Sequence, residues 1–127
     1  MEKDVIRTEA APAPFQGAPY NQAIRVGDFV FVAGQLGLAP GASAIEGDAA
    51  IQTEQVMRNL AAILEAAGSG LDRLVKTTVF LQSLDDFAAM NEVYARHVGE
   101  RPPARSTVEV AKLPSGALVE IEAIAHL

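Results

Sequence analysis

The chain has 127 residues, which suits a single domain over residues 1–127 with its own hydrophobic core. It contains no cysteine, so disulfides, thiolate catalysis and cysteine-based metal sites are excluded. Acidic residues outnumber basic ones by 16 to 10, giving a formal net charge of −6. Because nucleic-acid binding depends on clustered lysine and arginine, and no basic stripe is visible, we expect no nucleic-acid partner.

Membrane and metal partners are not expected either. No apolar run approaches the roughly 20 residues of a membrane-spanning helix. The segment Met1-Glu2-Lys3-Asp4 lacks the charged-then-apolar pattern of a signal peptide, so we expect a cytoplasmic protein by default. The two histidines, His97 and His126, do not stand at the spacing of metal ligands, and we expect no metal site.

The N-terminal third predicts a β-hairpin that follows an irregular segment. We expect a short strand over residues 5–8 and a loop over residues 9–19, where three prolines and a glycine prevent a regular element. Two β-rich runs, residues 23–26 and 29–33, flank Gly27-Asp28, which is typical of a hairpin turn.

The middle of the chain predicts two helices separated by a strand. Apolar residues at steps of three and four predict a helix over residues 48–67, with Gln52 toward solvent. Residues 74–82 are rich in β-branched side chains and predict a strand. A second helix begins after Ser83 and ends at Gly99. The residues expected to face the core are Ile51, Leu60, Ile63, Leu64 and Ala67 on the first helix, and Phe87, Met90, Tyr94 and Val98 on the second.

The last quarter of the chain predicts two strands whose side chains alternate between two faces. In residues 104–110, Arg105 and Thr107 share a face. In residues 118–125, apolar side chains fill one face, and Glu120 lies on the other.

We expect a turn at Pro114-Ser115-Gly116 to join these two strands as a hairpin. Tight pairing of the strands would bring Glu109 near Glu120, with Arg105 as a cation that offsets their repulsion.

The order of elements is three strands, a helix, a strand, a helix and two strands. This mixture predicts an α+β protein with one mixed β-sheet and both helices packed on one face. The opposite face of the sheet then needs a cover, and the natural cover in a small single domain is another copy of the sheet.

Arg105 is the strongest single candidate for a functional residue. Arginine offers a fixed fork for a carboxylate, and a nearby glutamate such as Glu120 can move protons. The alternative for Arg105 is a solvated ion pair with Glu109 or Glu120, and the spacing favours neither interpretation.

Three further positions admit both a structural and a functional interpretation. Tyr20 is typical of a packed ring with its hydroxyl in water, or it orients a ligand. Gly34 is typical of a turn at a strand end, or its bare backbone lines a pocket. Asn91 is typical of a solvated helix residue, or it contacts a ligand.

Together these residues resemble the Rid family of reactive intermediate deaminases, also called the YjgF-type or L-PSP family. Two of the segments that carry the resemblance are Gly17-Ala18-Pro19-Tyr20-Asn21 and Pro103-Ala104-Arg105-Ser106-Thr107-Val108-Glu109. The others are residues 32–35, 66–68, 75–80, 86–91 and 119–125. Each segment is short, but their order and spacing together are specific, and they run nearly end to end.

The resemblance implies a chorismate-mutase-like fold and a homotrimer in which the sheets form a central barrel with the helices outside. It implies a small pocket at each subunit interface. The implied activity is that of a 2-iminobutanoate/2-iminopropanoate-type deaminase, a hydrolase that converts enamine and imine intermediates such as 2-aminoacrylate to 2-keto acids and ammonia. This metabolite damage control uses no cofactor and no metal.

The resemblance also implies roles for individual residues. The carboxylate-binding arginine falls on Arg105 and the water-handling glutamate on Glu120. The substrate-binding positions fall on Tyr20, Gly34, Asn91 and Thr107. The chain departs from many deaminase members at Ala33, where they have serine, and at Thr107, where they have cysteine; these departures bear on substrate preference.

Three alternatives remain at this point. The first is a deaminase of a catabolic intermediate such as 2-aminomuconate. The second is a non-enzymatic trimer that binds a small carboxylate metabolite for regulation. The third is the ribonuclease activity attributed to some relatives, which the acidic composition and the lack of a histidine pair make the least favoured.

Overall fold

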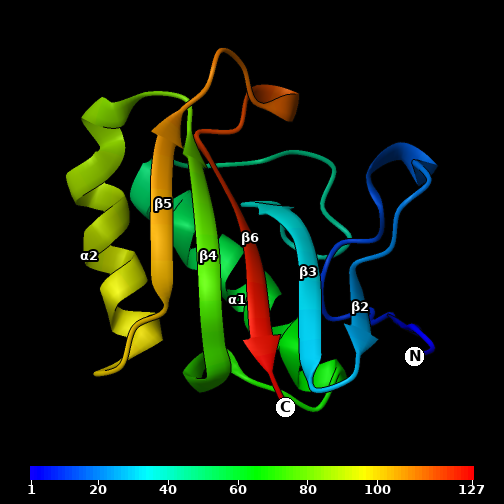
Figure 1. The fold of residues 1–127 in the computed structure, drawn as a ribbon. Coiled ribbons are helices and arrows are strands. Elements are labelled where there is room, and N and C mark those ends of the chain that lie inside the picture. The colour runs from blue at the N-terminus through cyan, green and yellow to red at the C-terminus, as the bar shows by residue number, and fades with distance from the viewer.

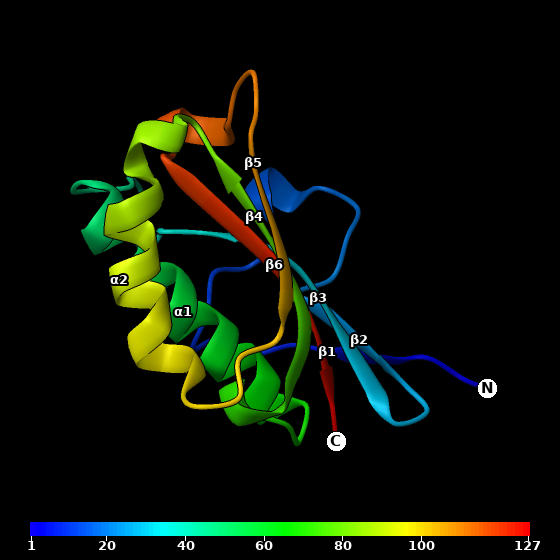
Figure 2. The ribbon, with the colours of Figure 1, turned by 60° about the vertical axis from the view of Figure 1, so that its left-hand side comes forward.

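The computed structural model describes all 127 residues as one mixed sheet with two helices (Figure 1). Both helices lie on the same side of the sheet (Figure 2), as the sequence predicts. The strands are β1 (Asp4–Ile6), β2 (Ala23–Val26), β3 (Phe29–Leu36), β4 (Leu74–Leu81), β5 (Ala104–Glu109) and β6 (Val119–His126). The helices are α1 (Ala49–Ala66) and α2 (Phe87–Val98). No helix combines the length and the apolar character that a membrane crossing needs.

The strand order is β1-β2-β3-β6-β4-β5, and it contradicts the predicted C-terminal hairpin. β4 lies between β5 and β6, pairing parallel with β5 and antiparallel with β6 (Figure 1). The chain runs from β4 through α2 to β5, which is the crossover that a parallel pair requires. β6 then enters the middle of the sheet, where the apolar face that the alternation predicted is fully covered. Alternation identifies the two faces of a strand but not its neighbours.

The expected meeting of Glu109 and Glu120 is therefore wrong. Glu109 lies at the end of the edge strand β5, where its Oε1 accepts a hydrogen bond of 3.0 Å from the backbone N–H of Leu84. That bond fixes the turn before α2, because it occupies a backbone donor that precedes the first helical turn.

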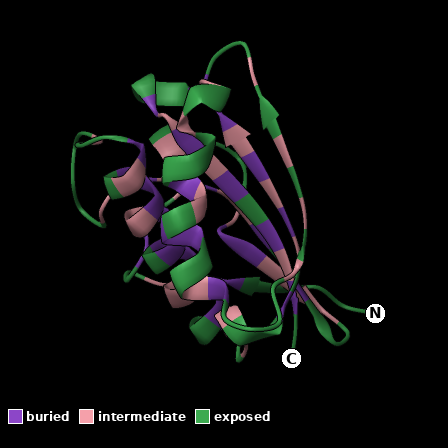
Figure 3. Cartoon of the chain, turned by 90° about the vertical axis from the view of Figure 1, so that its left-hand side faces the viewer, coloured by how far each residue is buried: buried purple, intermediate pink, exposed green.

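The core fills the space between the helices and the sheet, where buried positions of both layers face each other (Figure 3). Its largest fully buried side chains include Met57, Leu60 and Ile63 of α1 and Ile121 of β6. The prediction for the start of α1 is wrong in one detail: Ile51 is 59% exposed, whereas Gln52, expected in solvent, is 4% exposed.

Hydrogen bonds explain why the polar Gln52 is buried. Its Nε2 donates to the carbonyl of Gly47 at 2.9 Å, and its Oε1 accepts from the N–H of Leu118 at 2.9 Å. Asn59, also buried, donates to the carbonyls of Leu36 and Leu38 at 3.1 and 2.9 Å. A buried amide with its polar atoms bonded avoids the cost of desolvation. These two side chains tie α1 to the beginning of β6 and the end of β3.

Neither α1 nor α2 covers the opposite face of the sheet (Figure 2). Phe29 and Phe31 of β3 and Val108 of β5 are exposed on this face, because they alternate with the residues that face the helices. Glu120 and Glu122 also point to this side, opposite the apolar face of β6. The expectation that a second copy covers this face stays a prediction.

Candidate functional site

Arg105 lies on the helix side of β5 and has no counterion. Its guanidinium carbon is 4.9 Å from the centre of the Tyr94 ring and 5.6 Å from that of Phe87. Its Nη1 lies 4.0 Å from the sulfur of Met90, and it forms no ion pair in the chain. The alternative in which Arg105 pairs with Glu109 or Glu120 is therefore wrong. Cation–π contacts hold the arginine while its charge remains available.

A hydrogen bond to Thr77 of β4 fixes Tyr94 in turn. Its hydroxyl and that of Thr77 are 2.6 Å apart, and both residues are buried. Burial raises the pKa of Tyr94, against smaller opposing effects of the Thr77 hydrogen bond and the Arg105 charge. The phenol therefore stays neutral near neutral pH and does not cancel the charge of Arg105.

A cavity of about 510 Å³ opens beside Arg105. Its lining is mostly apolar and comes from α2 and from the segment that leads into β5. The lining residues are Phe87, Asn91, Tyr94, Ala95, Val98, Gly99, Pro102, Pro103 and Arg105. The predicted site residue Asn91 thus shares a cavity with Arg105, and it is not a fully solvated helix residue.

Thr107 carries the one buried side-chain polar atom in the chain that lacks a hydrogen-bond partner, its Oγ1. It lies two residues after Arg105, on the same face of β5. A buried hydroxyl without a partner costs free energy, and such groups are uncommon in folded proteins. Its position beside an arginine without a counterion points to a missing ligand or neighbour.

Glu120 faces the opposite side of the sheet and lies against Gly34. A Cβ built on Gly34 would be only 2.6 Å from Oε2 of Glu120. Gly34 stands where the β3–β6 register shifts, between Val32 and Gln35. Burial, and secondarily the charge of Glu122, raise the pKa of Glu120. The missing side chain of Gly34 therefore leaves room for a carboxyl group whose proton affinity is increased.

Tyr20 sits on the N-terminal loop, near Gly34. The two residues line the same small cavity. The Tyr20 hydroxyl accepts a hydrogen bond from the N–H of Phe15 and so closes the turn that precedes it. Buried Gln22 holds the rest of the loop, since its Nε2 donates to the carbonyls of Thr8, Ala11 and Pro12. The hydroxyl thus helps to hold the fold of the loop, and Tyr20 remains 41% exposed.

The six predicted residues form two groups that do not meet within one chain. The arginine half-site contains Arg105, Asn91 and Thr107; the glutamate half-site contains Glu120, Gly34 and Tyr20. β4 separates β5 from β6, so the two backbones lie about 10 Å apart at ordinary strand spacing. Arg105 and Glu120 also point to opposite faces of the sheet.

Several residues that shape these half-sites were not singled out from the sequence. Tyr94 and Phe87 were expected only as core residues, and Thr77 only as part of a strand. Their contact with Arg105 depends on the parallel pairing of β4 with β5, which the sequence did not reveal.

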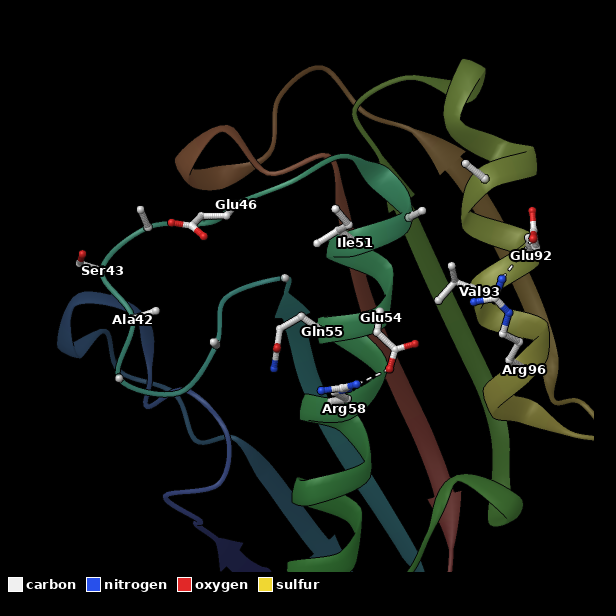
Figure 4. A pocket seen from close by; sticks show the side chains of 16 residues that line it. Ala42, Ser43, Glu46, Ile51, Glu54, Gln55, Arg58, Glu92, Val93 and Arg96 are labelled. Atoms are coloured by element: carbon white, nitrogen blue, oxygen red, sulfur yellow. Dashed lines mark hydrogen bonds and ion pairs between the residues drawn. The ribbon is translucent and has the colours of Figure 1, made fainter.

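A larger concavity, of about 850 Å³, lies on the outer side of the molecule between α1, α2 and the loop before α1 (Figure 4). None of the six predicted residues lines it. Both of its arginines are paired: Glu54 contacts Arg58 and also His97, each at 2.8 Å, and Glu92 contacts Arg96 at 3.1 Å, whereas Glu46 forms no ion pair. Because the cations of this groove already have partners, we place the candidate site at the half-sites and not in this groove.

His97, in the last turn of α2, is part of this outer network. Its hydrogen bond is the largest effect that lowers the pKa of Glu54, followed by the hydrogen bond from Arg58. No group of three or more histidine, aspartate or glutamate side chains is arranged to hold a metal ion.

An α+β sheet with both helices on one side, and an arginine without a counterion near its edge, define the structural class. The family model described as Endoribonuclease L-PSP matches residues 8–127. A RutC family protein of Pyrococcus abyssi is 53% identical over 127 residues, which cover 99% of this chain and 98% of that protein. The chloroplastic Reactive Intermediate Deaminase A of Arabidopsis thaliana is 44% identical over 128 residues, covering 100% of this chain and 67% of that protein.

The structural comparison agrees. The crystal structure of RidA from an Antarctic Psychrobacter species superposes with a TM-score of 0.93 at 44% identity, over 98% of this chain and 99% of the other. The chain therefore belongs to the L-PSP family, also called the Rid family, and the predicted fold class is confirmed. The family includes a reactive intermediate deaminase.

Proposed function

We propose that this protein is an imine deaminase that hydrolyses 2-aminoacrylate and similar 2-imino acids to 2-keto acids and ammonia. The observation that carries the proposal is the state of Arg105: half-buried, held by two aromatic rings and left without a counterion. Such an arginine is suited to a small carboxylate. The kinship with a deaminase of Arabidopsis supports the choice of reaction.

We also propose that the working form is a homotrimer with a pocket at each subunit interface. Arg105 and Glu120 each lack an ionic partner and face opposite sides of the sheet. They can serve one substrate only if the arginine half-site of one subunit meets the glutamate half-site of its neighbour. The exposed Phe29 and Phe31, on the same face of the sheet as Glu120, support this arrangement, since a neighbouring subunit would remove them from water.

The chemistry requires little beyond orientation and proton transfer, because the carbon of an imine is already electrophilic. Arg105 binds the substrate carboxylate through two N–H groups. The backbone at Gly34 and the free hydroxyl of Thr107 fix the nitrogen end. Glu120 takes a proton from water, and the resulting hydroxide adds to the carbon of the protonated imine, which gives a neutral tetrahedral adduct.

The second half of the reaction releases ammonia. Protonated Glu120 returns its proton to the amine of the tetrahedral adduct, and the C–N bond breaks as the hydroxyl oxygen gives its proton to the departing ammonia and becomes the keto oxygen. Water and protonated imine are consumed, and keto acid and ammonium leave. The raised pKa of Glu120 suits both steps, since a general base works best when its pKa approaches the working pH.

The three alternative functions receive different support. The mostly apolar cavity beside Arg105 offers no second cation for the further carboxylate of a substrate such as 2-aminomuconate. A regulatory trimer that binds carboxylates without turnover uses the same arginine, and only kinetics separates it from the deaminase. The ribonuclease named in the family description is least supported, because the net charge is −6 and His97 is paired with Glu54 on the outer side.

The test is competition between the protein and semicarbazide for imines generated in situ by an amino-acid oxidase. Wild-type protein should lower semicarbazone formation, and Arg105→Ala should return it to the uncatalysed level while the oligomer persists. Arg96→Ala is the matched control, because Arg96 is an exposed arginine on the outer side of α2. An active Arg105→Ala variant would overturn the assignment. Binding of 2-oxobutanoate without any turnover would support the regulatory trimer instead.

A further inference from the structure

The contacts around Arg105 form a closed arrangement across three elements. Thr77 and Arg105 are direct partners on the parallel strands β4 and β5. Tyr94 of α2 spans both: its hydroxyl is 2.6 Å from Oγ1 of Thr77, and its ring lies under the guanidinium at 4.9 Å. The Tyr94 side chain therefore links Thr77 of β4 to the guanidinium of Arg105.

We propose that Tyr94, anchored by Thr77, is the positioning residue that aims the Arg105 guanidinium at the carboxylate of the ligand. The proposal rests on the proposed function only in taking a small carboxylate as the ligand of this site.

The chemical nature of this support matters. An aspartate or glutamate would hold an arginine as firmly, but it would occupy the N–H donors and neutralise the charge. An aromatic face restrains the flat guanidinium and leaves its donors free for a ligand. Burial raises the pKa of Tyr94, so the ring stays neutral and does not compete with the ligand carboxylate.

The Thr77 hydrogen bond gives the ring a fixed position. Tyr94 is buried, and its hydroxyl is hydrogen-bonded to the Thr77 hydroxyl at 2.6 Å. Without Thr77 the phenol would lose this anchor to β4, and packing would become the main restraint on the ring. The arginine above it would then sample more orientations, which weakens a two-point hydrogen bond more than a simple charge attraction.

Three variants separate the parts of this support. Tyr94→Leu removes the ring, Tyr94→Phe keeps the ring but removes its hydroxyl, and Thr77→Val removes the partner hydroxyl with little change of shape. Arg96→Gln, on the outer side of the same helix, is the control. The measured quantities are the Kd values of 2-oxobutanoate and of its uncharged amide, 2-oxobutanamide, by calorimetry, and the Nε–H resonance of Arg105 by NMR.

We expect Tyr94→Leu to weaken 2-oxobutanoate binding about 10-fold, as loss of a partly desolvated cation–π contact implies. Tyr94→Phe and Thr77→Val should each weaken it a few-fold, and the double variant no more than either alone, because both remove the same hydrogen bond. Binding of the amide should change little. In the free protein, Tyr94→Leu should shift the Arg105 Nε–H resonance, since the ring current is lost.

Equal weakening of both ligands would show a merely structural role and overturn the proposal, as would an unchanged Arg105 resonance in Tyr94→Leu. If Tyr94→Leu does not fold, the two milder variants decide. The proposal is overturned if Tyr94→Phe and Thr77→Val both prefer 2-oxobutanoate over 2-oxobutanamide by the same ratio of Kd values as the wild type. The proposed function fails separately, if Arg105 binds 2-oxobutanoate but no imine is hydrolysed. Conversely, Arg105-dependent hydrolysis with an unchanged KM in the Tyr94 variants rejects the positioning role alone.

Discussion

Replacing Gly34 by alanine tests whether the placement of Glu120 matters for activity. The new Cβ would lie 2.6 Å from Oε2 and 3.0 Å from Cδ of Glu120. Ordinary contact begins near 3.4 Å, so the carboxylate has to retreat by about 0.8 Å. A misplacement of about 1 Å in an active site can cost about 100-fold in rate, and we expect a loss of that order in kcat.

The fold should tolerate the same change. The clashing atoms belong to the end of a flexible side chain, and the backbone of Gly34 is not in the left-handed region. Alanine also restricts the unfolded chain, so the free energy of unfolding should change by less than about 1 kcal/mol. Gly37→Ala is the contrasting variant, because its Cβ would lie 2.8 Å from the Cα and carbonyl oxygen of Gln52, backbone atoms that cannot move aside. We expect it to lose about 1–3 kcal/mol of stability.

The assay is imine competition for kcat and KM, with urea denaturation for stability. A folded Gly34→Ala oligomer with wild-type kcat would refute the reasoning, because it would show that Glu120 is not the group that handles water. A large loss of stability in Gly34→Ala would refute the claim that only the carboxylate has to move.

Three further predictions follow from single residues. Thr107→Val should keep or raise the melting temperature, because it removes a buried hydroxyl without a partner, and it should impair imine turnover. A lower melting temperature with unchanged turnover would argue against a ligand-facing Thr107. Because its pKa is raised, Glu120 contributes stability below its ordinary carboxyl pKa that is lost as the pH rises through the raised value. Glu120→Gln should therefore be more stable than wild type at pH 7 but not at pH 4 in urea denaturation, and wild-type kcat/KM should fall on acidification through that raised pKa. The pKa of Glu54 is lowered, so ionised Glu54 stabilises the fold at pH values above the ordinary carboxyl pKa, and this stabilisation is lost as the pH falls through the lowered pKa. Glu54→Gln should therefore lower the free energy of unfolding by up to about 1 kcal/mol at pH 7, measured by urea denaturation, and leave imine turnover unchanged.

The sequence predicted the elements and their faces well, because both depend on local periodicity. The alternation in residues 119–126 identified the buried face of β6, and the glycines after residue 67 identified the end of α1. It could not predict that β4 separates β5 from β6, since strand pairing depends on how α2 crosses the sheet. The wrong position of Gln52 has a similar origin: its burial depends on two backbone partners distant in the fold.

For the candidate site, too, the sequence predicted some features and missed those that depend on the tertiary fold. The resemblance to the family named Arg105 and Glu120, and no local pattern contradicts them. The sequence did not show that they occupy opposite faces, nor that Tyr94 and Thr77 support the arginine. The orphaned hydroxyl of Thr107 was also invisible, because it is defined by the absence of neighbours in three dimensions.

The central claim is that Arg105 of one subunit and Glu120 of another serve the same substrate. Mixing Arg105→Ala and Glu120→Ala subunits, after mild dissociation and reassembly, tests it directly. Each variant alone should be inactive. Random reassembly into trimers should restore roughly a quarter of wild-type imine hydrolysis, because one interface in four then has both intact residues. Mixed oligomers without any recovered activity would contradict the shared site.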